Sequence, residues 1–175
     1  MNFPILSSLI LLPLIGSVFI FFNKSSEKNR TIKYVSIFIT FSNFLLSLYL
    51  WYIFDKSISD FQFIENREWI SGLINYKVGI DGISVLFVVL TAFITPLCVI
   101  SVISTIKYRL KDFLIAILIM ESLMIGVFCS LDLVVFYLFF EGGLIPMFLI
   151  IVYGVVKEEF IPHLNFFSIH CSVLY

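Results

Sequence analysis

Five long apolar runs limit what this chain can fold into more than any other feature. Each holds about 20 mostly apolar residues, enough to cross a hydrocarbon core as a helix, and they cover residues 4–22, 32–54, 83–106, 113–131 and 133–156. Because lipid offers no hydrogen-bond partner to an open backbone, such runs must be helical. Composition agrees, since 61% of the residues are hydrophobic and 13% are charged. The sequence therefore predicts an all-α polytopic membrane protein with five transmembrane helices.

The charged residues between the runs predict how the chain is oriented. Residues 23–33 carry four basic residues against one acid, and residues 107–112 carry three against one. The long connection 55–82 carries five acids against three bases. By the positive-inside rule, the basic connections face the cytoplasm or matrix, so the amino terminus and the external connection 55–82 lie outside. Whether 55–82 holds a strand or a hairpin is left open.

The motifs of nucleotide, zinc and acyl chemistry are missing from the sequence. It contains no GxGxxG, P-loop, HExxH or GxSxG pattern, and Cys98, Cys129 and Cys171 have no CxxC spacing. The net charge of −1, with no basic stripe, argues against nucleic acid as a partner. We therefore expect no cofactor and no metal in this chain, and the lipid bilayer as a partner.

Two carboxylates, Glu121 and Glu141, lie inside the fourth and fifth runs. Each is ten residues from the turn near Leu131 that joins these runs. At about 1.5 Å of rise per residue, each lies about 15 Å deep, which is half of a hydrocarbon core of about 30 Å. The spacing predicts two acids near the bilayer midplane, at matching depth on adjacent antiparallel helices.

A charge at that depth is costly and therefore informative. Insertion scales put its cost at about 2.5–3.5 kcal/mol, and such residues usually face a bundle interior and mark an ion or proton path. We interpret Glu121 and Glu141 as proton-transfer residues. The alternative, a protonated glutamate that hydrogen-bonds within the helix bundle for packing alone, stays open for both.

Four further residues support this interpretation. Gly142 and Gly143 remove side chains beside Glu141, so that water or another helix can approach closely. Pro146 has no backbone N–H, so it leaves the carbonyl of Gly142 free to bind water. Asp81, before Gly82, is predicted to cap the third helix at the positive end of its dipole.

Two stretches resemble a known family. VGIDGISVLFVVLTAFITPL (78–97) and MESLMIGVFCSLDLVVFYLFFEGGLIPMFLII (120–151) are similar to subunit M of NADH:quinone oxidoreductase, whose mitochondrial equivalent is subunit 4 (ND4) of respiratory complex I. The resemblance covers about residues 1–156. It implies an antiporter-like membrane-arm subunit with roughly fourteen helices and internal inverted repeats, of which this chain would be the amino-terminal portion.

The resemblance also implies a role. In this family, Glu141 matches a glutamate on the fifth helix that pairs with a lysine on a later helix, and Glu121 matches an acid on the fourth helix. Such subunits carry no redox centre. NAD, flavin, iron–sulfur clusters and quinone are expected in other subunits of the complex, where NADH oxidation and quinone reduction drive proton translocation. The implied partners are other membrane-arm subunits, in a bacterial inner membrane or, as the alternative, a mitochondrial inner membrane.

The last residues depart from the family pattern. After Gly154 the chain reads VVKEEFIPHLNFFSIHCSVLY, so residues 157–175 are predicted to be a divergent tail that is disordered or partly helical. A reading-frame slip near residue 155 would explain this, and the chain would then be a truncated copy that cannot translocate protons in isolation. An Mrp-like cation/proton antiporter subunit and a non-functional remnant are the competing functions.

Overall fold

A computed structural model describes residues 4–22, 30–58, 60–70, 74–106 and 109–155. Along the chain these form α1 (Ile5–Phe22), α2 (Arg30–Ile53), β1 (Gln62–Ile70), β2 (Ile74–Ile80), α3 (Gly82–Thr105), α4 (Leu110–Cys129) and α5 (Leu133–Val155). All five helices are long and apolar enough to cross a membrane. The predicted helical fold with five spans is therefore confirmed, and the chain is a multi-pass membrane protein. The predicted tail, 157–175, lies outside the described residues.

The fourth helix differs most from its predicted bounds. It begins at Leu110 rather than at residue 113, because the backbone N–H of Phe113 donates to the carbonyl of Arg109 at 3.2 Å and so adds a turn. Leu110 is buried, although the charged residues around it favoured a loop in the sequence. Packing of one apolar side chain thus extends the helix into a polar segment.

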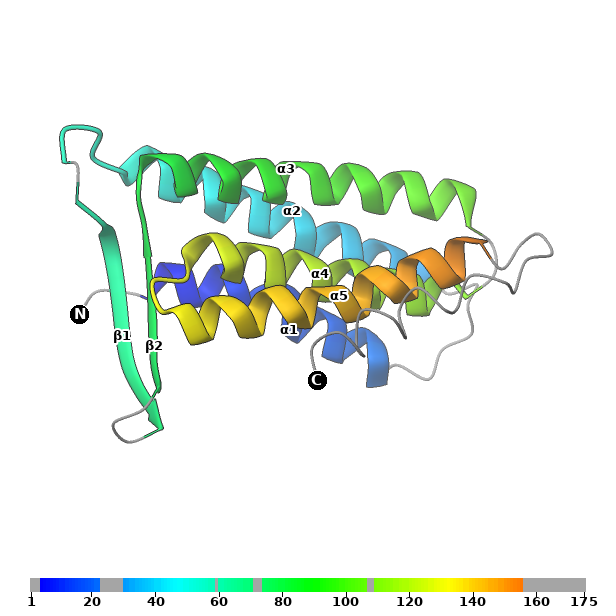
Figure 1. The fold of residues 1–175 in the computed structure, drawn as a ribbon. Helices are drawn as coiled ribbons and strands as arrows, with labels where there is room; N and C mark the ends of the chain where they lie inside the picture. The colour runs from blue at the N-terminus through cyan, green and yellow to red at the C-terminus, as the bar shows by residue number, and fades with distance from the viewer. Residues whose placement is uncertain (1–3, 23–29, 59, 71–73, 107–108, 156–175) are drawn as a thin grey trace.

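Helix α4 lies at the centre of the bundle (Figure 1). It packs against α1, α3 and α5, while α2 packs against α3 and α1. Helix α5, by contrast, packs against α4 and touches the strand β2, so most of its surface faces outward. The position of α4 explains why it carries the largest share of buried residues among the five helices.

Helices α4 and α5 approach closely at Gly126. The ring of Phe139 lies where a side chain at Gly126 would stand, since a Cβ built there meets three ring atoms at 2.8–2.9 Å. The hydroxyl of Ser130 donates to the carbonyl of Gly126 at 2.7 Å near the end of α4. Glycine at this position therefore sets how close the two helices pack.

The connection 55–82 forms an antiparallel hairpin across one end of the helices, as Figure 1 shows. Tyr76, Val78 and Ile80 alternate along β2 toward one face, and Val78 and Ile80 are fully buried. The backbone N–H of Leu131, in the turn between α4 and α5, donates to the carbonyl of Lys77 at 2.9 Å. The hairpin is thus joined to the turn that carries α5.

The hairpin also caps α1. The carboxylate of Glu65 in β1 accepts from the backbone N–H groups of Leu6 at 3.0 Å and Ser7 at 3.3 Å, and from the Ser7 hydroxyl. The hydroxyls of Ser7 and Tyr76 lie 3.2 Å apart. A carboxylate at a helix amino terminus satisfies open N–H groups and complements the helix dipole. Burial beside this cluster raises the pKa of the Tyr76 hydroxyl.

Candidate functional site

Glu121 lies near the middle of α4 and is 2% exposed. One carboxylate oxygen, Oε1, accepts a hydrogen bond from the side-chain amide Nδ2 of Asn43 in α2 at 2.9 Å. Asn43 is fully buried as well. Glu121 was predicted from the sequence and Asn43 was not, although their contact links α4 to α2 through side chains at mid-height.

Glu121 belongs to a layer of buried polar side chains that divides the apolar core. On the hairpin side of this layer lies one apolar cluster, which includes Leu9, Leu50, Val88 and Ile125. On the other side lies a second cluster, which includes Ile20, Ile32, Val99 and Leu114. Between them are the side chains we call the polar layer: Ser17, Thr40, Asn43, Thr95, Glu121 and Ser122. Because four helices contribute to it at mid-height, this layer lies where the bilayer midplane is expected.

Helix α2 presents its polar residues on one face. Ser36, Thr40, Asn43 and Ser47 are all fully buried, and their spacing of four, three and four residues follows the helical repeat. The three hydroxyls donate to carbonyls of α2 itself, whereas Asn43 bonds to Glu121 in α4. That spacing is the signal in the sequence from which this face of α2 was predictable.

Ser122 sets the rotation of α4 about its axis. Its hydroxyl donates to the carbonyl of Ile10 in α1 at 2.5 Å, and both residues are buried. Successive residues of a helix point about 100° apart. With Ser122 held against α1, the neighbouring Glu121 is turned toward α2 and α3, which places its carboxyl group in the polar layer.

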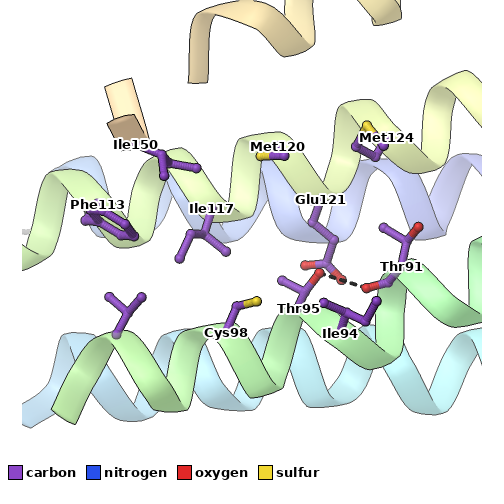
Figure 2. A pocket seen from close by; sticks show the side chains of 11 residues that line it. Thr91, Ile94, Thr95, Cys98, Phe113, Ile117, Met120, Glu121, Met124 and Ile150 are labelled. Carbon is purple, nitrogen blue, oxygen red and sulfur yellow. Dashed lines mark hydrogen bonds between the residues drawn. The ribbon is translucent and has the colours of Figure 1, made fainter. Parts of the chain in front are cut away.

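A cavity of about 450 Å³ lies between α3 and α4, beside Glu121. Figure 2 shows Glu121 pointing from α4 toward Thr91 and Thr95 of α3. The hydroxyl of Thr95 donates to the carbonyl of Thr91 at 2.9 Å. The rest of the wall is mostly apolar, and among the residues that the structure describes no lysine, arginine or histidine lines it. The carboxyl group of Glu121 is thus the strongest polar group beside this cavity.

The chemistry open to this site is proton binding. A single carboxyl group with one amide partner can take up or release a proton, as intramembrane acids in proton paths do. Across the described residues, no group of three or more histidine, cysteine, aspartate or glutamate side chains is placed to hold a metal ion. Glu121 therefore offers an acid–base group.

Glu141 occupies a different environment. Its side chain is exposed on the outer surface of α5, and the hydroxyl of Tyr137, one turn earlier, lies within hydrogen-bonding reach of it. Glu121, in contrast, points into the polar layer. The structure therefore places the two acids on adjacent helices but does not bring their carboxyl groups to a shared face.

The heights of the two acids differ by less than one helical turn. Phe139 lies against Gly126, and Gly142 lies against Leu123, at 3.5 Å from a Cβ built on the glycine. Counting along the antiparallel helices from these contacts places Glu141 about three residues nearer the turn than Glu121. At about 1.5 Å per residue, the offset is about 4.5 Å.

The three residues around Glu141 that were predicted to support it differ in surroundings. A Cβ built on Gly143 meets no atom of the described residues within 4 Å, so the helix surface there is open to them, whereas Gly142 faces Leu123. Pro146 lies inside α5 and is buried, and the helix continues past it to Val155. Gly143 is therefore the position beside Glu141 at which another segment has room to approach.

Asp81 caps α3, as predicted. Its Oδ1 atom accepts from the backbone N–H groups of Ser84 at 2.7 Å and Ile83 at 3.1 Å. These hydrogen bonds, led by the one from Ser84, hold the pKa of Asp81 below its ordinary value of 3.8. Asp81 lies outside the polar layer, at the hairpin end of the bundle, so the structure assigns it a helix-capping contact.

The lowered pKa of Asp81 predicts a dependence of stability on acid. Because the carboxylate is favoured in the folded state, its contribution is present above the unfolded-state pKa and is lost as the pH falls through the folded-state pKa. Thermal unfolding of the chain in detergent can be followed from a pH of about 6 down to about 3. Over this range the free energy of unfolding should fall further in wild type than in Asp81→Asn, by about 1 kcal/mol or less. Asparagine keeps the cap without the charge. An equal loss in both proteins would contradict the prediction.

Comparison with known proteins gives a consistent result. The chain is 50% identical over 139 residues to NADH-quinone oxidoreductase subunit M of Rhodobacter capsulatus, which covers 79% of the chain and 27% of that relative. It is 47% identical over 147 residues to NADH-ubiquinone oxidoreductase chain 4 of Marchantia polymorpha, covering 83% and 30%. With subunit M of Rickettsia prowazekii it shares 41% identity over 154 residues, covering 86% and 31%. The matched part thus spans about a third of these relatives or less, and no family model matches the chain.

Proposed function

The chain is a homologue of subunit M of NADH-quinone oxidoreductase and chain 4 of NADH-ubiquinone oxidoreductase, and on this premise we propose that it is a proton-translocating membrane subunit of that complex. The observation that carries the proposal is the 50% identity over 139 residues with the Rhodobacter capsulatus subunit. Glu121 and Glu141 are the residues proposed to transfer protons.

The arrangement of polar groups supports a role in proton movement. A buried carboxyl group inside a membrane span is costly, and here it sits in a polar layer at mid-height rather than at a helix end. Glu141 lies on α5, whose surface is mostly free of contacts with the other described residues, next to the open surface at Gly143. In the proposed complex, that side of α5 faces further protein, since an ionised group facing lipid is strongly disfavoured.

The proposal divides the chemistry between subunits. NADH oxidation and quinone reduction, with the NAD, flavin, iron–sulfur clusters and quinone they need, are assigned to other subunits. This chain contributes acid–base groups, and the other membrane-arm subunits are its proposed partners. A bacterial inner membrane is its proposed location, with a mitochondrial inner membrane as the alternative, because relatives from bacteria and plants both match.

The experiment uses cells that encode the chain. An affinity tag on the chain should co-purify the NADH-oxidising subunits from detergent-solubilised membranes. Deletion of its gene should lower NADH-driven acidification of inverted membrane vesicles, and expression of the chain should restore it. The matched control is the proton gradient driven by ATP hydrolysis in the same vesicles, which deletion should leave unchanged.

Two outcomes would contradict the proposal. Exchange of sodium or potassium for protons by the chain without NADH would favour a cation/proton antiporter. Insertion of the tagged chain into the membrane with no associated subunit, and no change in acidification on deletion, would favour a non-functional remnant.

A further inference from the structure

The hydrogen bonding between Glu121 and Asn43 is incomplete. Nδ2 of Asn43 donates to Oε1 of Glu121, but Oε2 of Glu121 and Oδ1 of Asn43 are buried without a hydrogen-bond partner among the described residues. Leaving a buried polar atom unpaired costs about 1–3 kcal/mol, and nearly all such atoms in proteins are paired. The pair therefore leaves each side chain with one oxygen that can take a further hydrogen-bond partner.

The open oxygen has a property that suits proton exchange. Oε1 is held by Asn43, so a proton that binds Glu121 is directed to Oε2, the oxygen without a partner. Asn43 can donate to a carboxylate oxygen and, more weakly, to the carbonyl oxygen of a protonated carboxyl group. The hydrogen bond therefore survives both states of Glu121, and the side chain keeps its position while the proton comes and goes.

The cavity between α3 and α4 provides a route. Glu121 is part of its wall, yet the side chain is 2% exposed, so a proton must cross that wall to reach it. Figure 2 shows the carboxyl end of Glu121 pointing toward Thr95, whose hydroxyl donates to the carbonyl of Thr91 and can still accept a hydrogen bond from water. At about 450 Å³ the cavity has room for several water molecules, each of which takes about 30 Å³ in the liquid.

We propose that Glu121 is a proton-binding site reached by water through the cavity between α3 and α4, with Asn43 as the positioning residue that holds its carboxyl group. In the binding step, Oε2 takes a proton from a hydronium ion, an O–H bond forms, and a water molecule is left. Release is the reverse. Any role of this site in proton pumping rests on the proposed function. Water access and proton exchange, in contrast, are properties of the chain itself and can be tested on the chain in a membrane.

Infrared spectroscopy of the full chain in lipid vesicles tests proton exchange. The C=O stretching band of protonated Glu121 is the carboxyl band that disappears in Glu121→Gln. In D₂O this band should shift to lower wavenumber within minutes, because water reaches the proton and replaces it by deuterium. Absence of a Glu121 band at every pH at which the chain stays folded, or a band that does not shift over hours, would overturn the proposal.

The same band tests Asn43. Leucine has nearly the shape of asparagine but no donor, so in Asn43→Leu the band should move to higher wavenumber as the carbonyl oxygen loses its hydrogen bond. The matched control is Ser47→Ala, since Ser47 is buried on the same face of α2 but donates to the carbonyl of Phe44. Movement of the band in Ser47→Ala to the same extent, or none in Asn43→Leu, would overturn the positioning role.

A native cysteine tests the route without relying on Glu121. Cys98 lines the cavity and is exposed, and a thiol reacts with water-soluble methanethiosulfonates only where water lets it ionise. With the other cysteines replaced by serine, Cys98 should react at least about tenfold faster than a cysteine at Ile100, introduced in a Cys98→Ala background. Ile100 is exposed at nearly the same height on another face of α3. Equal rates would overturn the route through the cavity.

These outcomes separate the inference from the proposed function. A chain with a deuterium-exchanging Glu121 and a reactive Cys98 that does not associate with NADH-oxidising subunits would refute the proposed function and leave the site intact. A chain that co-purifies with the complex but shows neither property would refute the proton-binding site and leave membership of the complex intact.

Discussion

Replacing Glu141 by glutamine in the assembled complex is expected to reduce NADH-driven proton pumping to about a tenth of the wild-type rate or less. Glutamine has the size and shape of glutamate but cannot bind and release a proton. Because Glu141 is exposed on α5, the substitution breaks no packing within the described chain, so the loss would reflect acid–base chemistry. The measurement is acidification of inverted membrane vesicles after addition of NADH, with NADH oxidation followed in parallel.

Two controls separate loss of the proton site from loss of the complex. Glu141→Asp keeps a carboxylate and should retain part of the activity. Ile145→Gln places the same neutral amide one turn further along the exposed side of α5, where Ile145 is 60% exposed, and should leave pumping near wild type. All variants must show the same amount of complex on native gels. Wild-type pumping by a fully assembled Glu141→Gln complex would show that Glu141 carries no proton.

Replacing Gly126 by alanine is expected to destabilise the bundle by about 1–3 kcal/mol, the usual cost of overpacking a filled core. The added Cβ would lie 2.8 Å from the ring of Phe139, including the ring atom nearest the backbone, so the ring cannot simply rotate away. Relief requires α5 to move from α4, along with the hairpin joined to the turn between them. Thermal unfolding of the purified chain in detergent measures the effect.

The matched control is Gly143→Ala on the same helix pair. A Cβ there meets no atom within 4 Å in the described part of the chain, so alanine should leave the unfolding temperature unchanged or raise it slightly through its higher helix propensity. Combining Gly126→Ala with Phe139→Ala should recover part of the loss, because the two side chains compete for the same space. Equal stability of the two single variants would mean that the contact between Gly126 and Phe139 does not limit the packing.

The five spans were predictable because their cause is local. A run of about 20 apolar residues has one stable form in lipid, and that form is a helix whatever its neighbours are. The cap at Asp81 was predictable for the same reason, since its partners Ile83 and Ser84 lie within three residues. The extra turn of α4 at Leu110 was not, because it depends on burial of that side chain against other helices.

The site was predictable in part. Glu121 stood out because a carboxylate in an apolar run is rare and costly, so its identity alone carries information. Asn43 was missed, because an amide among the hydroxyl residues of α2 reads as ordinary helix packing until its partner in α4 is known. Whether 55–82 forms a hairpin was left open, since the N–H groups that donate to Glu65 and the bridge partner of Val78, Ser130, lie on elements far away in sequence.

Hydropathy and spacing were enough to establish the number of spans and the class of protein, and they predict the approximate depth of Glu121 and Glu141. These patterns are informative because exposing backbone polar groups or charge to lipid costs free energy, and that cost applies to each segment independently. The direction in which each acid points was decided by tertiary packing. The contacts of Ser122 with Ile10 of α1 and of Gly126 with Phe139 set the rotation and spacing of α4. They turn Glu121 toward Asn43 and leave Glu141 on the outer surface of α5. Rotation about a helix axis depends on contacts between helices, which no single run of sequence contains.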